Sequence, residues 1–241
     1  MGLNYSNLPD WLANNPVFRG LFLFRKLFII KKKFSHYSQF AEDVSIIRHF
    51  PKHFKGFFVD VGCFHPVKYN NTYRLYRKGW RGVNIDIDTI KIAGFKWLRP
   101  GDVNISCAVS NQRGELTYWS NGFYSLTITL DEAFASGKPG YKKKTVKSDT
   151  LSNILDNTRY KNQKIDFLTI DAEGHDFEVL ESLDFERYQP QLIAVETHQE
   201  RLEAVEQERL FGFLTERGYS LVNWVGLTLL FKHKDAAPIK L

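Results

Sequence analysis

The chain has 241 residues, of which 43% are hydrophobic and 15% aromatic, enough for one domain of ordinary size with a full core. Its two cysteines, Cys63 and Cys107, are too few for a disulfide framework and lack zinc-ligand spacing, so we expect a reducing compartment. The net charge of +6 and the pI near 9.1 fit an acidic partner or an anionic membrane surface, without choosing between them.

The amino-terminal segment 17–34 combines Phe, Leu and Ile with Arg and Lys in a helical pattern. Arg25 and Lys26 interrupt its apolar run, which is too short to span a bilayer. No small-residue cleavage site follows, so we do not expect a secretory signal. Two interpretations stay open. The helix packs its apolar face on the domain, which is the commoner behaviour, or it lies in a membrane interface.

The next part of the chain alternates between helix and strand patterns. Apolar spacing predicts a helix over residues 38–50, with Ser38 as its N-cap and Pro51 after its end. In chain order we then expect a strand at 57–61, a helix from about 70 to 78, a strand at 83–87, a helix at 89–98 and a strand at 103–109.

The middle of the chain is less regular. Residues 116–119 can form an extra strand, and residues 121–141 have no clear period, which is typical of a lid or substrate loop. We interpret the lysines at 142–144 and 147 as a solvated face. The remaining pattern predicts helices at 151–155, 176–183 and 200–217, and strands at 165–170, 190–196, 219–224 and 227–232. We therefore expect an α/β fold with a mostly parallel sheet, one antiparallel strand and helices on both faces.

Two segments carry the chemistry, residues 56–66 and residues 165–177. In each, an apolar run ends in an aspartate, Asp60 or Asp171, and a glycine turn follows. Parallel sheets bind ligands at these strand ends. A dinucleotide site needs three glycines for its pyrophosphate, but only Gly62 is present, and Asp60 and the bulky His65 oppose a phosphate. S-adenosylmethionine has an ammonium group and no phosphate, so neither objection applies to it.

Taken together, several segments in this order resemble the FkbM-type methyltransferases. They are residues 38–43, 59–62 with 65–66, 71–73, 79–86 and 165–175. The resemblance runs from about Tyr37 to Phe231, so we divide the chain into a basic amphipathic extension, 1–36, and a methyltransferase domain, 37–241.

This resemblance implies a class I, Rossmann-like methyltransferase fold with S-adenosylmethionine as methyl donor. It also implies O-methylation of a hydroxyl on a sugar, glycan or secondary metabolite. We accordingly expect a small-molecule or glycan acceptor and no nucleic-acid partner. We expect a cytoplasmic location, and a peripheral membrane contact through residues 17–34 stays open.

Residue by residue, the resemblance also implies a donor site. Its expected members are Gln39, Glu42, Asp60, Gly62, Asp86, Ala108 and Asp171. Gly62 turns the first loop, Asp60 anchors that loop or meets the ammonium group, and Asp86 accepts the ribose hydroxyls. Asp88 competes with Asp86 if the strand is shifted by two residues. Cys107 and Ala108 follow the third strand, where the family contacts adenine.

Catalysis needs a proton acceptor beside the acceptor oxygen. We expect Asp171, His175 and His198 to be catalytic, with His175 or His198 as the base because imidazole titrates near neutral pH. His65 is a rival base. Asp171, Glu196 and His198 could also hold a metal ion, but the resemblance does not require one and we expect none.

Two other functions stay open on the sequence. An oxidoreductase on a related sheet is disfavoured by the missing glycines. A binding or scaffold protein without catalysis is disfavoured by the intact acids Asp60, Asp86 and Asp171.

Overall fold

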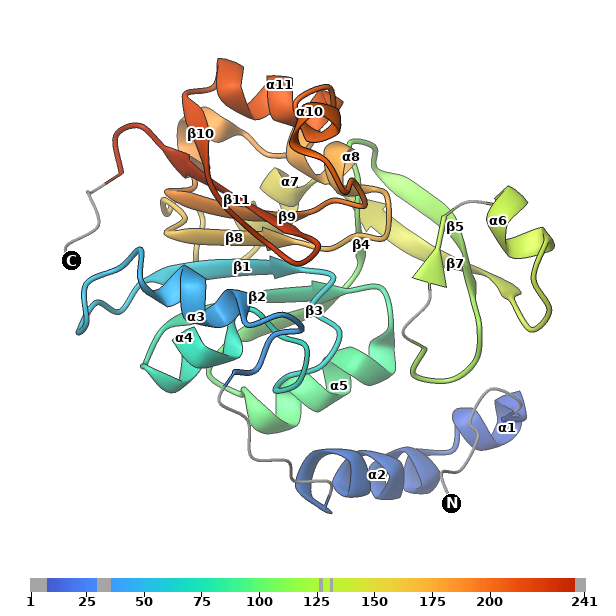
Figure 1. The fold of residues 1–241 in the computed structure, drawn as a ribbon. Helices are drawn as coiled ribbons and strands as arrows, with labels where there is room; N and C mark the ends of the chain where they lie inside the picture. Colours follow the sequence, from blue (N-terminus) through green and yellow to red (C-terminus); the bar gives the residue numbers. More distant parts are fainter. Residues whose placement is uncertain (1–7, 30–35, 126–127, 131, 237–241) are drawn as a thin grey trace.

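The computed structural model describes residues 8–29, 36–125, 128–130 and 132–236, and its main element is a seven-stranded sheet. The strands are β1 (Phe57–Val61), β2 (Arg81–Asp86), β3 (Val103–Ser106), β8 (Phe167–Ile170), β9 (Leu192–Glu196), β10 (Tyr219–Val225) and β11 (Thr228–His233). They are arranged in the order β10-β11-β9-β8-β1-β2-β3 (Figure 1). All pairs are parallel except those of β11, which runs antiparallel to both β9 and β10. The expected sheet, mostly parallel with one antiparallel strand, is confirmed.

Helices cover both faces of this sheet (Figure 1). One face carries α3 (Glu42–Ile47), α4 (Tyr73–Arg77) and α5 (Thr89–Leu98), and the other carries α7 (Leu151–Asp156), α8 (Asp176–Glu181) and α11 (Arg209–Glu216). Every residue of β1 and β8 is buried, since both sides of these central strands face a helix layer. Two short helices, α9 (Phe185–Tyr188) and α10 (Leu202–Val205), complete this part of the chain.

A second sheet stands beside the first and was not expected from the sequence. The predicted strand 103–109 breaks at Cys107, so β3 stays in the main sheet while β4 (Ala108–Val109) joins the second. That sheet has the order β4-β7-β5-β6, with β5 (Gly114–Ser120), β6 (Ile128–Thr129) and β7 (Lys142–Asp149). The lysine run is therefore a strand. Seven of its residues pair with β5. This pairing through the backbone cannot be predicted from the pattern of side chains.

Three further predictions were wrong in detail. The segment 121–141 is not structureless, because it contains β6 and α6 (Glu132–Ser136). The predicted helix 200–217 is split into α10 and α11. The predicted helix 38–50 shortens to α3, because Ala41 adopts a left-handed φ of 70° that a continuous helix excludes. The N-cap residue is Ala41 and not Ser38 as predicted, although Ser38 Oγ accepts the N–H of Asp43 in the first turn at 3.0 Å.

The amino-terminal segment folds as α1 (Asp10–Ala13), α2 (Pro16–Phe24) and a π-helical turn, η1 (Arg25–Ile29). The Asn15 side chain begins α2 by accepting the N–H groups of Val17 and Phe18. One side of α2 packs on the domain, where Phe22 and Leu23 are buried. Residues 30–34 of the expected helix lie outside the described residues. Among the helices that the structure describes, none has the length and apolar character needed to cross a membrane.

A buried polar network joins the loops beneath the cavity end of the sheet. The guanidinium of Arg99 is fully buried and forms an ion pair with Asp102 at 2.9 Å. It also donates to Asn70 Oδ1 at 3.1 Å and Thr72 Oγ1 at 3.0 Å. Asn70 and Thr72 in turn donate to Asp60 at the end of β1. One side chain at the end of α5 therefore satisfies groups from the loop before α4 and from the turn before β3.

We expect Arg99→Met to lower the free energy of unfolding by about 3–5 kcal/mol, because two buried carboxylates, Asp60 and Asp102, would lose their cation. Urea unfolding followed by circular dichroism measures the change. The matched control is Arg187→Met, because Arg187 also pairs with two carboxylates, Asp156 and Asp184, but is 38% exposed. We expect it to cost much less than Arg99→Met, because solvent screens this exposed ion pair. Equal losses for the two variants would contradict the structural role of the network.

Candidate active site

A cavity of about 330 Å³ opens at the carboxyl ends of β1, β2, β3 and β8. Its walls include Gln39, Gly62, Phe64, Asp86, Lys91, Cys107, Ala108, Asp171, Glu173 and His175. The second sheet supplies another wall, through Leu116 of β5 and residues 128–130 around β6. The cavity is therefore formed by strand-end loops of the main sheet on one side and by the second sheet on the other.

Gly62 brings the ends of β1 and β8 together. Its φ is +77°, and a Cβ added there would lie 1.7 Å from the carbonyl oxygen of Asp171. The two strand ends are also joined by the Asp171 N–H, which donates to the Val61 carbonyl. The sequence predicts that Gly62 turns the first loop. The structure shows that the glycine is needed for the contact between two loops that line the cavity.

Asp86 lies at the end of β2, on the cavity wall. Its carboxylate accepts the N–H groups of Phe64 at 3.1 Å and Asp88 at 2.8 Å, and Lys91 Nζ lies 3.8 Å away. Asp88, the alternative to Asp86, instead caps α5 by accepting the N–H of Ile90 at 2.9 Å. Asp86 is thus the acid that faces the cavity, and Asp88 has a structural role at the helix start.

Two other expected donor-binding residues lie outside the cavity wall. Asp60 is buried and bonded to Asn70 and Thr72, so it anchors the first loop. Glu42 is buried too, and it accepts the N–H of Phe40 at 2.7 Å. Gln39, Gly62, Asp86, Ala108 and Asp171 do line the cavity.

The side chain of Asp176 fixes the backbone of the turn after β8. The carboxylate of Asp176 accepts the N–H groups of Ala172 at 3.1 Å and Gly174 at 3.3 Å. Between them, Glu173 adopts a left-handed φ of 54°, a conformation that non-glycine residues rarely take. Such conformations often occur at functional sites, where the surroundings hold them in place. Asp176 therefore holds the turn that presents Glu173 to the cavity.

Three carboxyl groups gather at this end of the cavity. Asp171 and Glu196 face each other closely enough to share a proton. Although the Asp171 side chain reaches the open cavity, protein surrounds it on its other sides. Desolvation and then repulsion by Glu196 raise its pKa well above the usual range. Desolvation and the charge of Glu196 also raise the pKa of Glu173 to about 7.

The three candidate histidines lie in different surroundings. His175 lines the cavity, with Nε2 3.0 Å from Ser110 Oγ and Nδ1 3.4 Å from Glu178. His198 is exposed, 3.7 Å from Glu196, and is not part of the cavity wall.

His65 is unsuited to act as a base. Burial, with the charges of Lys68 and Lys26, lowers its pKa to about 3. Its Nδ1 already accepts the N–H groups of Val67 and Lys68, so the ring nitrogen with a lone pair is occupied.

Sequence reasoning missed several residues of the cavity wall. Lys91 is 4% exposed and sits 4.8 Å from the ring centroid of Phe64, yet a lysine in an apolar helix gave no signal of a site. Leu116 and Ile128 belong to the second sheet, which the sequence did not predict. Glu173 is not among the catalytic residues expected from the sequence.

The described residues contain no group of three or more His, Cys, Asp or Glu side chains that could hold a metal ion. The set Asp171, Glu196 and His198, considered above as a metal site, does not make such a group.

The raised pKa of Glu173 predicts a pH-dependent stability. The folded chain keeps this proton above the ordinary pKa of 4.5, so the stabilising contribution is complete below that pH and is lost as the pH rises through about 7. Glutamine mimics the protonated acid. We therefore expect Glu173→Gln to be more stable than the wild type at about pH 8, with no difference at about pH 4. Thermal unfolding across this range measures the effect.

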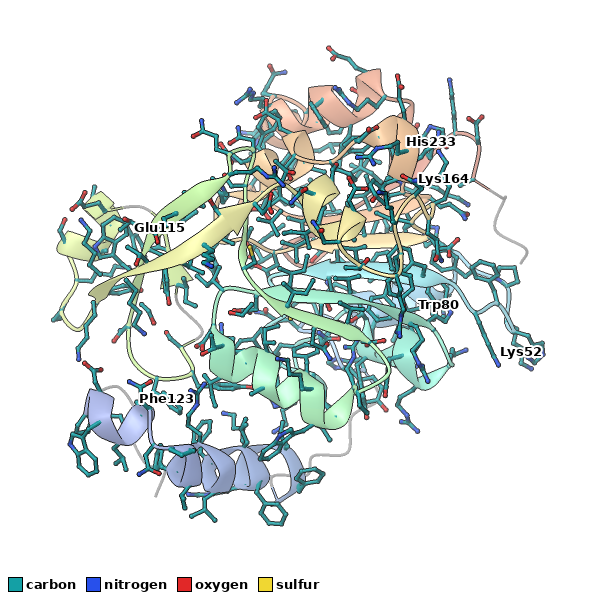
Figure 2. The ribbon with its side chains drawn as sticks, turned by 180° about the vertical axis from the view of Figure 1, so that it is seen from behind. Lys52, Trp80, Glu115, Phe123, Lys164 and His233 are labelled. Carbon is teal, nitrogen blue, oxygen red and sulfur yellow. The ribbon has the colours of Figure 1, made fainter. Side chains whose placement is uncertain are left out.

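The matched control is Glu115→Gln, because Glu115 lies on the exposed surface of β5, away from the cavity (Figure 2). We expect this change to leave the pH dependence as it is in the wild type. A Glu173→Gln curve parallel to the wild-type curve would show that Glu173 is not a strained acid in the folded chain.

Comparisons with known proteins bear on the same region. The family described as "Methyltransferase FkbM domain" matches residues 60–221. No curated protein matches the chain. Among solved structures, the methyltransferase FkbM of Methylobacillus flagellatus has 12% sequence identity and a TM-score of 0.46, over 74% of this chain and 44% of that one. This chain thus spans less than half the length of that protein.

A second solved structure is a TehB-like SAM-dependent methyltransferase from Corynebacterium glutamicum, with 14% identity and a TM-score of 0.43. That comparison covers 91% of this chain and 100% of the other. The family match covers most of the chain and includes both strand-end loops that carry the cavity acids, from Asp60 to beyond Glu196. With its Rossmann-like class I sheet, the chain therefore belongs to the FkbM methyltransferase family.

Proposed function

We propose that the protein is an S-adenosylmethionine-dependent O-methyltransferase that acts on a hydroxyl of a sugar, glycan or secondary metabolite. The observation that carries this proposal is the set of carboxyl groups in the cavity. Asp86, Asp171 and Glu173 reach it, and Lys91 is paired with Asp86. Carboxyl groups accept hydrogen bonds from hydroxyl and ammonium groups, which suits S-adenosylmethionine better than a pyrophosphate.

The parts of S-adenosylmethionine match the groups available in the cavity. Asp86, at the end of β2, suits the two ribose hydroxyls because a carboxylate accepts both. Ile85, Val109 and Ile128 offer an apolar wall for adenine. Gln39 and Asp171 offer polar groups for the amino acid end. The cavity thus provides hydrogen-bond acceptors for the hydroxyl and ammonium groups of S-adenosylmethionine and an apolar surface for its adenine ring.

When bound, the donor supplies an electrophilic methyl group on a sulfonium. The protein then has two tasks, which are to align the acceptor oxygen and to take its proton. Glu173 is suited to the second task, since a base with a pKa near 7 is both deprotonated and basic enough at neutral pH. The turn fixed by Asp176 keeps this carboxylate at the cavity wall.

The neighbouring groups provide a way out for the proton. Glu196 lies beside Asp171, and 3.7 Å from the exposed ring of His198. A proton taken at Glu173 can therefore pass through these carboxyls to His198 and the solvent. We assign His175 an orienting role, because both of its ring nitrogens already face protein groups.

Titration calorimetry with S-adenosylmethionine and with NAD⁺ tests the donor. We expect binding of the first and none of the second. Methyl transfer from labelled donor to fractionated glycans and metabolites then tests the reaction, and base-sensitive methyl esters separate carboxyl from hydroxyl acceptors. Binding of NAD⁺ in preference to S-adenosylmethionine would overturn the proposal.

We expect Asp86→Asn to weaken S-adenosylmethionine binding by about 1–3 kcal/mol, because neutral amides lose the charged hydrogen bonds to the ribose. Calorimetric dissociation constants give the change. Asp88→Asn is the matched control, since asparagine still caps α5 and the side chain lies off the cavity wall. Equal affinities for wild type and Asp86→Asn would remove Asp86 from the donor site.

We expect Glu173→Gln to lower turnover by about 10²–10⁴-fold with little change in donor affinity. The activity of the wild type should rise with pH through about 7, as Glu173 loses its proton. His198→Gln tests the exit of the proton and should cost less. If His175→Gln or His198→Gln abolished turnover while Glu173→Gln kept it, a histidine would be the base.

A further inference from the structure

The amino-terminal elements present an apolar stripe to the solvent. On α2 and η1 the exposed side chains are Val17, Leu21, Phe24 and Phe28, with exposed fractions of 70, 67, 54 and 41%. Their spacing of four, three and four residues places them on one side of the helix. Trp11 of α1, 73% exposed, extends this set. We call these five residues the outer stripe.

The opposite side of α2 is already used. Phe22 and Leu23 pack with Ile90 of α5 and with Tyr124. Phe123 lies between the amino-terminal helices and the rest of the molecule (Figure 2), with its ring centroid 5.0 Å from that of Phe22. Figure 1 shows α1 and α2 as a separate layer on the outer side of α5. Because the inner side holds the helix on the domain, the outer stripe is not needed for that packing.

Two exposed cations lie beside the outer stripe. Arg25 is exposed at the start of η1. Lys142 Nζ lies 3.9 Å from Asp10 Oδ1, which places the end of β7 beside α1. The lysines of β7 at 142–144 and 147 are all exposed. Large apolar side chains next to exposed cations are the pattern of a surface that binds an anionic membrane interface.

We propose that α1, α2 and η1 form a docking surface for a bilayer that contains anionic phospholipid. The outer stripe enters the interface, while Arg25 and Lys142 meet the headgroups. A second copy of the chain is a poorer occupant, because a two-fold contact would bring the same cations of both copies together. A bilayer offers apolar depth and negative charge at the same surface.

This docking would also set the orientation of the cavity. Tyr124 packs against Phe22 of α2 on one side and against Phe64, a cavity-wall residue, on the other. The bilayer would therefore lie beyond the helix layer, on the side where Phe64 forms the cavity wall. This position suits a methyl acceptor that is attached to a membrane surface or released from one.

Cosedimentation of the full chain with vesicles tests the proposal. One set of vesicles contains phosphatidylcholine alone, and the other contains an equal mixture of phosphatidylcholine and phosphatidylglycerol. We expect binding to the mixed vesicles, weak binding to the neutral ones, and loss of binding as salt is added. The double variant Leu21→Ser, Phe24→Ser should bind the mixed vesicles at least about tenfold more weakly.

The matched control is Leu202→Ser with Val222→Ser, which removes two exposed apolar side chains from α10 and β10, outside the stripe. It should bind vesicles as the wild type does. Arg25→Gln with Lys142→Gln should weaken binding to the mixed vesicles and not to the neutral ones. Thermal unfolding and donor binding check that each variant is folded.

Three results would overturn the proposal. Equal vesicle binding by the wild type and the stripe variant would exclude the stripe. Equal binding to neutral and mixed vesicles would exclude the anionic lipid. No vesicle binding, together with a concentration-dependent dimer that the stripe variant abolishes, would assign the surface to a second copy.

Discussion

The geometry of the strand ends around the cavity depends on the ion pair and hydrogen bonds of the buried Arg99 guanidinium. Asp102 accepts the N–H of Gly82 at the start of β2, so the ion pair also fixes where that strand begins. On its other side, Arg99 holds the two residues that anchor Asp60. Desolvation raises the pKa of Asp60 and the charge of Arg99 opposes that shift, which favours the ionised form that the loop needs. The loop that carries Phe64 is thus stabilised by the charge of Arg99, which does not itself line the cavity.

The division of work between acids follows from this arrangement. Asp60 lies near the charge of Arg99 and has a structural role. Asp86 instead faces the cavity, and its charge is balanced by Lys91. At Asp171, Glu173 and Glu196, desolvation and repulsion between carboxyl groups raise the pKa values, and the nearby His198 and Lys91 oppose this shift only in part. One end of the cavity is therefore ready to hold a ligand by ionised groups, and the other to exchange protons. This contrast, rather than any single residue, favours a transferase that must both bind a cation and deprotonate an acceptor.

Much of the main sheet could be predicted, because β1, β8 and β9 are buried on both faces and read as apolar runs. The terminal hairpin was also predictable from two such runs around Gly226. The second sheet was not, since β7 is rich in lysine and is held by its register with β5, a contact between distant segments. For the site, Asp86 and Asp171 followed from their places at strand ends. Lys91 and the pKa of Glu173 depend on burial and on neighbours from other elements, which a linear pattern does not contain.

The break at Cys107 separates the molecule into parts that can vary independently. The chain leaves the main sheet after β3, builds the second sheet, and returns to the main sheet only at β8. Residues 110–148 can therefore change in length or composition without altering the register of the seven strands that hold Asp86 and Asp171. In that stretch lie Leu116 and Ile128, which form the wall opposite the strand ends. For the methyltransferase proposed above, remodelling this one insertion would change the wall opposite the strand ends while Asp86 and Asp171 stay in place.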